Sequence, residues 1–236
     1  MSGRTHWRWC VPDADATCSF IDPGRGTAAL RKSFKTACGG LLVTDFWAAH
    51  DAAACAKKQK CLPHLLRDRK RTTRYHAAAG DWPAFAKRLT RPIRDSPRLR
   101  RSRAEVSAGV FASRRARLQT RLNRPIEAAW EQTHARRLVK RSRRHRDELR
   151  TFLDVAGVPP DDNRAEREIR PAVVMRKNSC GDGSAEGALT QSVLMSVFRT
   201  RKRRGHDPIA TLVEALKTRL RTGQLPPLPA KVAAHG

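Results

Sequence analysis

Two carboxylates, Asp45 and Glu166, have sequence surroundings that suit metal-dependent chemistry. Asp45 follows the apolar run Leu41–Thr44, which has the composition of a buried strand, and α/β proteins usually place functional groups at the carboxyl ends of such strands. Glu166 lies one turn into a helix that we expect to begin near Asn163. A carboxylate pair of this kind can hold Mg²⁺, and two such ions can activate a nucleophile and stabilise the leaving oxygen of a phosphodiester.

Each carboxylate also has an ordinary structural explanation. Glu166 precedes Arg170 by four residues, and such a pair on a helix surface contributes about 0.2–0.5 kcal/mol. Asp45 can cap the helix that we expect after it. The spacing alone therefore leaves both the metal site and the structural roles open.

Basic residues near these carboxylates are candidates for contact with phosphate. His64 and Arg67 lie upstream of Glu166. Cys61 and His64, with two residues between them, have the spacing of one of the two ligand pairs of a zinc site. No second pair follows at zinc-finger spacing, so we expect a packed cysteine instead. Beyond Glu166, four cations have the spacing of a phosphate track, for which a solvated basic face is the alternative: Arg167, Arg170, Arg176 and Lys177.

The overall charge indicates a polyanionic partner. The 236 residues include 49 Lys and Arg against 22 Asp and Glu, a net charge of +27, and nucleic acid is the default partner for such a chain. The hydrophobic share of 39% supplies a core and argues against wholesale disorder. No apolar run approaches the roughly 18 residues of a membrane span. The start lacks the apolar stretch of a secretory signal, and the six cysteines show no disulfide framework, so we expect reduced thiols in a cytosolic protein.

Strand signals are confined to the beginning of the chain. Residues 5–22 predict two short strands joined by a turn, and 27–37 predict a helix. A buried strand is expected over 41–44, a second helix over 47–56 and a further short strand over 57–62.

From about residue 63 the pattern becomes helical and basic. The segment from Arg98 to Arg150 has 17 basic and 5 acidic residues. We expect three prolines to break or kink any long helix there: Pro92, Pro97 and Pro125.

The last third predicts three helices. The first begins near Asn163 and ends or kinks at Pro171, and the second ends in basic residues before Gly205. The third opens at Asp207, a good N-cap followed by proline, and stops at Gly223.

Six segments, in order along the chain, resemble the signatures of the insertion-sequence-sixty-six (IS66) family of bacterial DDE transposases. Three belong to the first third and resemble its ribonuclease-H-like core, and three belong to its C-terminal signature. The segments are Thr5–Cys10, Leu42–Ala49, Lys60–Asp68, Pro159–Ser179, Gln191–Val197 and Thr222–Pro229.

This resemblance implies an α/β fold in which a mixed sheet, flanked by helices, carries three acidic ligands for Mg²⁺ in a two-metal site. Asp45 matches the second acid and Glu166 the third, and Asp162 replaces one Asn of the family's Asn-rich run before that Glu. The chemistry implied is metal-dependent hydrolysis of a DNA phosphodiester at the element end. Attack of the freed 3′-hydroxyl on target DNA then follows.

The resemblance also divides the chain. Residues 1–68 are expected to form the N-terminal part of the catalytic core, and 69–155 an all-helical basic insertion. Residues 156–204 are expected to return to the core with the third acid, and 205–236 to form a C-terminal helix and tail.

The first acid of the family lies on a strand before the segment matched by Thr5–Cys10, where this sequence has only four residues. We therefore expect the first acid, and a central strand of the sheet, to be missing from an N-terminally truncated chain. The early acids Asp13, Asp15 and Asp22 fall in or after turns, and we expect none of them to substitute.

Two functions from different classes follow. One is transposase-type DNA cleavage and strand transfer in a bacterial cytoplasm, at the nucleoid, by a homo-oligomer acting on transposon ends and target DNA. The other is a non-catalytic DNA-binding remnant that regulates or joins an intact transposase. A general RNA-binding protein ranks last, because the chain has one Tyr and few aromatic residues for base stacking.

Overall fold

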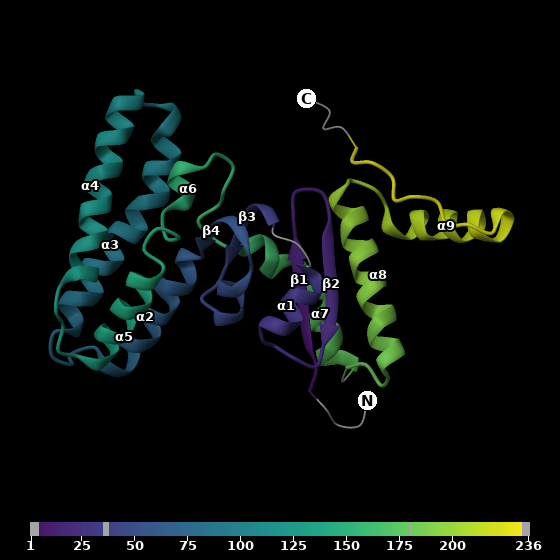
Figure 1. The fold of residues 1–236 in the computed structure, drawn as a ribbon, viewed down its shortest axis with the longest axis horizontal. Helices are drawn as coiled ribbons and strands as arrows, with labels where there is room; N and C mark the ends of the chain where they lie inside the picture. Colours follow the sequence, from purple (N-terminus) through teal and green to yellow (C-terminus); the bar gives the residue numbers. More distant parts are fainter. Residues whose placement is uncertain (1–4, 35–37, 180, 233–236) are drawn as a thin grey trace. The chain divides into compact units, whose positions relative to one another are not determined.

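The computed structural model describes residues 5–34, 38–179 and 181–232, and it is a mixed α/β structure with small sheets and mostly helix (Figure 1). The chain forms two compact units, Met1–Lys32 with Asn163–Gly236, and Ser33–Asp162. Among the helices described, none is long and apolar enough to cross a membrane.

The first unit is built on an antiparallel hairpin. Its strands pair Trp7 with Asp22 and Pro12 with Thr17, and the Asp13 carboxylate closes the turn by accepting from the amides of Asp15 and Ala16. Helix α7 packs against β1 and helix α8 against β2. The elements are β1 (Trp7–Pro12), β2 (Thr17–Asp22), α1 (Thr27–Ser33), α7 (Asn163–Ser179), α8 (Ala185–Arg203) and α9 (Pro208–Thr222).

Hydroxyl groups of α8 satisfy the outer backbone groups of β2. Thr200 Oγ1 accepts from the Thr17 amide at 3.0 Å, and Ser196 Oγ accepts from the Ser19 amide at 2.8 Å. A helix therefore covers the edge that β2 would otherwise expose to another strand.

The second unit combines a parallel strand pair with a helical bundle. Strands β3 (Cys38–Thr44) and β4 (Cys55–Lys60) pair Leu41 with Lys57 and Thr44 with Lys60, and the 3₁₀ turn η1 (Ala48–Ala52) lies between them. The helical elements that follow are α2 (Leu62–His76), α3 (Trp82–Arg101), η2 (Ser102–Ala104), α4 (Ala108–Glu127), α5 (Thr133–Arg144) and α6 (Thr151–Asp154).

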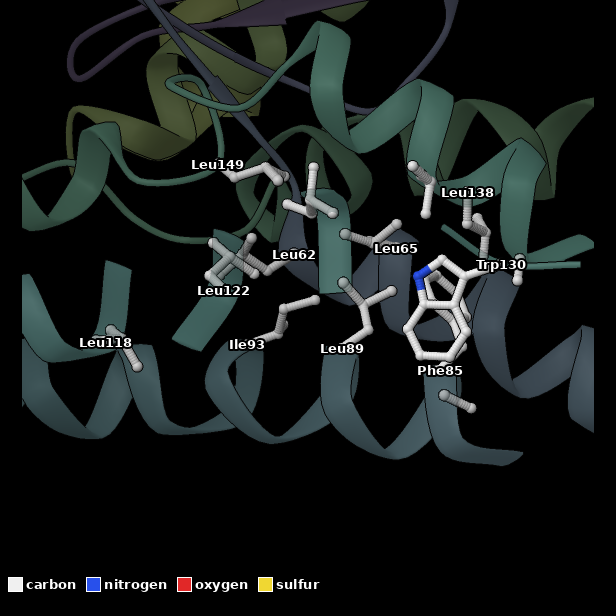
Figure 2. Close-up of a cluster of buried hydrophobic side chains, with 14 of the residues drawn as sticks. Leu62, Leu65, Phe85, Leu89, Ile93, Leu118, Leu122, Trp130, Leu138 and Leu149 are labelled. Carbon is white, nitrogen blue, oxygen red and sulfur yellow. The ribbon is translucent and has the colours of Figure 1, made fainter. Parts of the chain in front are cut away.

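One apolar cluster fills the bundle (Figure 2). Trp82 and Phe85 at the start of α3 are fully buried, and Phe85 meets Trp130 edge-on at 5.1 Å between ring centroids. The other members come from every helix of the bundle and include Leu62, Leu65, Leu89, Ile93, Leu118, Leu122, Ile126, Leu138, Leu149 and Phe152.

The prolines that we expected to break or kink their helices do not break them, and a kink at each stays a prediction. Pro92 and Pro97 lie inside α3, Pro125 lies inside α4, and Pro171 lies inside α7. An interior proline costs about 3 kcal/mol, whereas each large apolar side chain buried along α3 returns about 1.5–3 kcal/mol. Packing of the helix face thus outweighs the lost backbone hydrogen bonds.

Other boundaries also differ from the sequence expectation. The helix expected over 47–56 is only the short turn η1, because β4 already begins at Cys55 and pairs with β3. The helix expected over 27–37 ends at Ser33, and residues 35–37 lie outside the described part. The helices of the last third agree more closely, since α9 has the Asp207 cap and ends at left-handed Gly223.

The covered edge of β2 yields a stability prediction. Thr200→Val keeps the side-chain shape but leaves the buried Thr17 amide without its acceptor, so we expect the free energy of unfolding to fall by about 2 kcal/mol. Thr200→Ser retains the hydroxyl and is the control. Urea unfolding in which the Val variant is no less stable than the Ser variant would contradict this role.

Candidate functional site

Asp45 directly follows β3, as the sequence predicts. Its Oδ1 accepts from the Trp47 amide at 2.9 Å and lies 2.9 Å from His50 Nδ1. Burial alone would raise the pKa of Asp45, but the hydrogen bonds from His50 and Trp47 outweigh it and hold the pKa below its usual value. The half-buried side chain is therefore an ionised carboxylate, oriented by the turn that starts η1.

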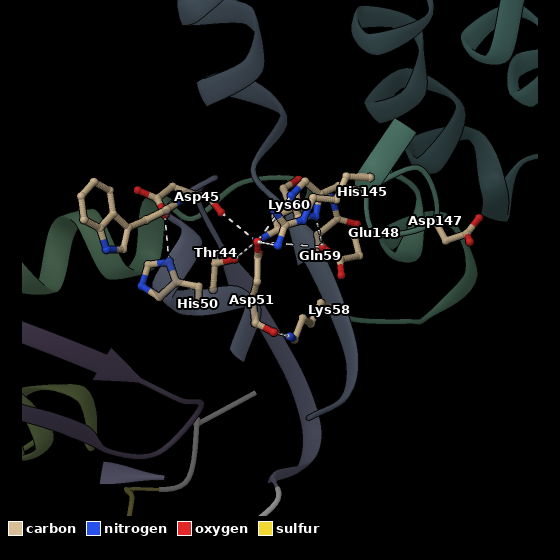
Figure 3. A network of polar contacts seen from close by, with 12 residues as sticks. Thr44, Asp45, His50, Asp51, Lys58, Gln59, Lys60, His145, Asp147 and Glu148 are labelled. Atoms are coloured by element: carbon tan, nitrogen blue, oxygen red, sulfur yellow. Dashed lines mark hydrogen bonds and ion pairs between the residues drawn. The ribbon is translucent and has the colours of Figure 1, made fainter. Parts of the chain in front are cut away.

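A fully buried ammonium lies beside Asp45 (Figure 3). Lys60 Nζ, at the end of β4, donates to the Asp45 carbonyl oxygen at 3.2 Å and to Thr44 Oγ1 at 3.2 Å. Asp51 neutralises it at 2.8 Å, and Glu148 lies at 4.0 Å. The Lys60 side chain thus ties the end of β3 to the end of β4 and fixes the backbone from which Asp45 projects.

The segment after α5 is held against the same strand. The Lys60 amide donates to the Glu148 carbonyl at 2.8 Å, and the buried Gln59 side chain accepts from the Phe152 amide at 2.8 Å. Thr151 Oγ1 donates to the Lys58 carbonyl. The helical bundle is therefore docked onto β4 by hydrogen bonds between groups about 90 residues apart in sequence.

Among the described residues of this unit, two groups of side chains are of the types that bind metal ions, and one group already surrounds a cation. Asp51, His145 and Glu148 bring their ligand atoms within 4.8 Å of one another. The Lys60 ammonium lies among these carboxylates, and His145 bonds Glu148 at 2.8 Å. Arg144 also pairs with Asp51 at 3.1 Å, so two basic side chains face the two carboxylates of this group.

The second group is Cys61, His64 and Asp162. Cys61 is fully buried at the start of α2, which confirms the packed cysteine, and burial followed by its hydrogen bond to Asp162 raises the thiol pKa to about 12. Asp162 Oδ1 lies 3.4 Å from His64 Nδ1 and raises the pKa of the imidazole. Sequence reasoning missed Asp162 as a partner, because only the fold brings it to α2.

His64 and Arg67 lie together on α2, as candidates for phosphate contact. Arg67 is exposed, and its guanidinium lies 3.1 Å from His64 Nε2. The His64 ring is thus held between Arg67 and Asp162.

Glu166 lies in the first turn of α7 and is exposed. The positive end of a helix stabilises a carboxylate at that position. The four cations of the predicted phosphate track are exposed along the same helix: Arg167, Arg170, Arg176 and Lys177. Asp45 and Glu166 belong to different units, and their pairing stays a prediction.

Another acid of α7 has a structural role. Glu168 accepts from Arg199 Nε and from Arg203 at 2.6 Å each, and these bonds outweigh burial and lower its pKa. Glu168 therefore ties α7 to α8, and it is not a free metal ligand.

Comparison with known proteins gives a family. The family model described as "Transposase IS66 family" matches residues 1–190. Two curated relatives from Sinorhizobium fredii (strain NBRC 101917 / NGR234) are similar over shorter stretches. Uncharacterized protein y4jD is 34% identical over 79 residues, and Uncharacterized protein y4qI is 37% identical over 78 residues.

The matched stretches cover 34% and 33% of this chain but only 16% and 14% of the two relatives. No solved structure matches the chain.

The buried ammonium of Lys60 leads to a prediction about the stability of the fold. Asp51→Asn removes the main counter-charge of Lys60, so we expect a loss of about 3 kcal/mol in the free energy of unfolding at pH 7. Burial would raise the pKa of Asp51, but the hydrogen bond from Lys60 outweighs it and lowers the pKa. The contribution is therefore present above about pH 3.8 and is lost as pH falls through the lower, folded-state pKa.

The measurement is urea unfolding of both proteins from pH 7 down to pH 3. The control is Asp51→Asn combined with Lys60→Met, which removes both charges and is expected to recover part of the loss. A difference in stability that stays constant over this pH range would show that Asp51 does not neutralise Lys60.

Proposed function

The chain belongs to the IS66 transposase family, and from this premise we propose that it cleaves and joins DNA during transposition. In this proposal Asp45 and Glu166 are the second and third acidic ligands of the Mg²⁺ ions at the catalytic centre, and cleavage with these two acids, despite the expected lack of the first, is part of what is proposed. The observation that carries it is the ionised, half-buried Asp45 carboxylate at the carboxyl end of β3, in the position that the family resemblance assigns to the second acid.

The donor set fits a hard divalent cation. Mg²⁺ prefers carboxylate oxygens and retains water and phosphate oxygens, and both proposed ligands are carboxylates with access to solvent. His50 and the Trp47 amide hold Asp45 in one orientation, which lowers the cost of ordering it around a metal.

The covalent chain supports the pairing of the two acids. His64 is an electrostatic neighbour of Asp45, and Asp162 lies 3.4 Å from His64. Glu166 follows Asp162 by only four residues, which span at most about 14 Å even when fully extended. The covalent connection thus limits how far Glu166 can lie from Asp162, although 121 residues separate Glu166 from Asp45 in sequence.

The strand pairings suit a ribonuclease-H-like core, which we propose as the finer fold. Such a mixed sheet combines antiparallel and parallel neighbours, and β1–β2 and β3–β4 supply one pair of each kind. The core then comprises 1–68 and 156–204, the helical insertion 69–155, and the C-terminal segment 205–236. Most members of the apolar cluster around Trp82 and Phe85 belong to the insertion, and Leu62 and Leu65 of α2 complete it.

The chemistry follows from these positions. Bound Mg²⁺ would activate the attacking oxygen and stabilise the leaving oxygen of the scissile phosphodiester. Asp45, fixed by His50, and Glu166, in the first turn of α7, would hold the metal from two elements. The exposed cations of α7, with His64 and Arg67, would bind the neighbouring phosphates and keep the DNA in place.

The partners are transposon-end DNA and target DNA, and the working form is a homo-oligomer, since two ends must be held together. Its place would be at the nucleoid of a bacterial cell. A non-catalytic DNA-binding role beside an intact transposase is the second candidate, favoured by the net charge of +27, which suffices for binding without catalysis.

Substitution of the proposed ligands separates the two functions. Asp45→Asn and Glu166→Gln are each expected to reduce cleavage of element-end DNA in Mg²⁺ by 100-fold or more, because each removes a metal-binding charge. DNA affinity is expected to change less than threefold. The assay uses the full chain and a labelled duplex carrying the terminal sequences that flank its gene.

The matched control is Glu105→Gln, an exposed carboxylate of the helical insertion with no ion pair among the described residues. It is expected to cleave at the rate of the unaltered chain. An unaltered chain that binds this DNA but does not cleave it would overturn the catalytic proposal in favour of the second candidate. Failure to bind DNA would overturn both.

A further inference from the structure

A basic groove lies on the helical bundle, and neither Asp45 nor Glu166 is among the residues that line it. It has a volume of about 1080 Å³ and is bounded by α2, α3 and the Arg121 side chain of α4. Buried Trp82 and Ala86 contribute to its apolar lining, together with Thr73 and Thr90. Six cations line it, and we call it the α2–α3 groove: Arg69, Lys87, Arg91, Arg94, Arg98 and Arg121.

Four of these cations form a stripe on one face of α3. Lys87, Arg91, Arg94 and Arg98 are spaced by four, three and four residues, which places them above one another on a helix. At 1.5 Å of rise per residue the stripe is about 16 Å long, and neighbouring cations are about 4.5–6 Å apart along the axis. A single small anion cannot occupy such a stripe, whereas a row of phosphates can.

The basic side chains that line the groove outnumber its carboxylates. Asp95 is its one lining carboxylate, and it is already paired with Arg121 at 2.6 Å and with Arg98 at 3.6 Å. Lys87, Arg91 and Arg94 are exposed and have no carboxylate within 4.0 Å in the part of the chain that the structure describes.

Arg69, on the α2 side of the groove, also indicates that this surface binds an anion. Its Nε is buried and has no hydrogen-bond acceptor among the described residues. Burial, and then repulsion from Arg94, lower the pKa of this guanidinium. Two guanidiniums that face each other without a counter-charge are stabilised when an anion binds between them.

We propose that the α2–α3 groove binds the sugar-phosphate backbone of duplex DNA. The inference goes beyond the proposed catalytic site and rests on the proposed function only for the identity of the polyanion. Arg suits phosphate because its planar fork gives bidentate hydrogen bonds, and the stripe follows a backbone over several nucleotides. Contacts of this kind position DNA without reading its sequence.

The test compares two triple variants with the same change in net charge. In the groove triple, Lys87→Gln, Arg91→Gln and Arg94→Gln remove three cations of the stripe. In the control triple, Arg114→Gln, Arg117→Gln and Arg124→Gln remove three exposed cations of α4 that do not line the groove. All six positions are exposed, and the single variant Arg94→Gln serves as a milder substitution if a triple is poorly folded.

Fluorescence anisotropy with a labelled random-sequence duplex measures affinity as a function of salt for each full-length chain. The slope of log K against log salt is negative, and each lost phosphate contact makes it less steep by about 0.9. The slope of the groove triple is therefore expected to be less steep by about 2.7. Its affinity at 0.1 M salt is expected to fall at least tenfold, and the control triple is expected to change less than threefold. Arg94→Gln alone is expected to lose about 0.9 in slope.

Equal effects of the two triples, or unchanged binding by the groove triple, would overturn the groove while leaving the catalytic proposal intact. Loss of DNA cleavage in Asp45→Asn with normal salt dependence would conversely bear only on the catalytic site. An unaltered chain that does not bind duplex DNA overturns both proposals.

Discussion

The structure around the proposed catalytic carboxylate depends on the neutralisation of one buried charge. The Lys60 ammonium has no contact with solvent, and a charge in that position is tolerated only when oppositely charged and polar groups surround it. Asp51 from the β3–β4 connection, Glu148 from the segment after α5 and the backbone of Asp45 supply these groups. The same contacts join the strand pair to the helical bundle, so the position of Asp45 and the docking of the bundle share one electrostatic requirement.

Features encoded by neighbouring residues were predictable from the sequence. Asp45 ends a strand and Glu166 lies in the first turn of a helix from Asn163, because an apolar run and a helical pattern mark these elements locally. The third helix of the last third begins and ends where its cap residues predict, at Asp207 and Gly223. The family was also predictable, since its signatures are long and occur in order.

Features that depend on packing between distant segments were not predictable in this way. A lysine in a basic strand gives no sign that it is fully buried, and its partner Glu148 is 88 residues away. From the sequence alone, the prolines of α3 and α4 are expected to break their helices. The helices persist because the apolar face of each one packs into a shared core. Cys61 and His64 have the spacing of one ligand pair of a zinc site, and only the fold shows that Asp162 lies beside them.

The central claim is that Asp45 and Glu166 belong to the same metal site, and iron-directed cleavage of the chain measures this most directly. Fe²⁺ bound in place of Mg²⁺ generates hydroxyl radicals with ascorbate and peroxide, and these cut the backbone beside the ion. The account predicts cuts near both Asp45 and Glu166, which excess Mg²⁺ suppresses and which Asp45→Asn or Glu166→Gln abolishes together. Cuts at only one of the two positions, or cuts at one that persist when the other acid is replaced, would contradict it.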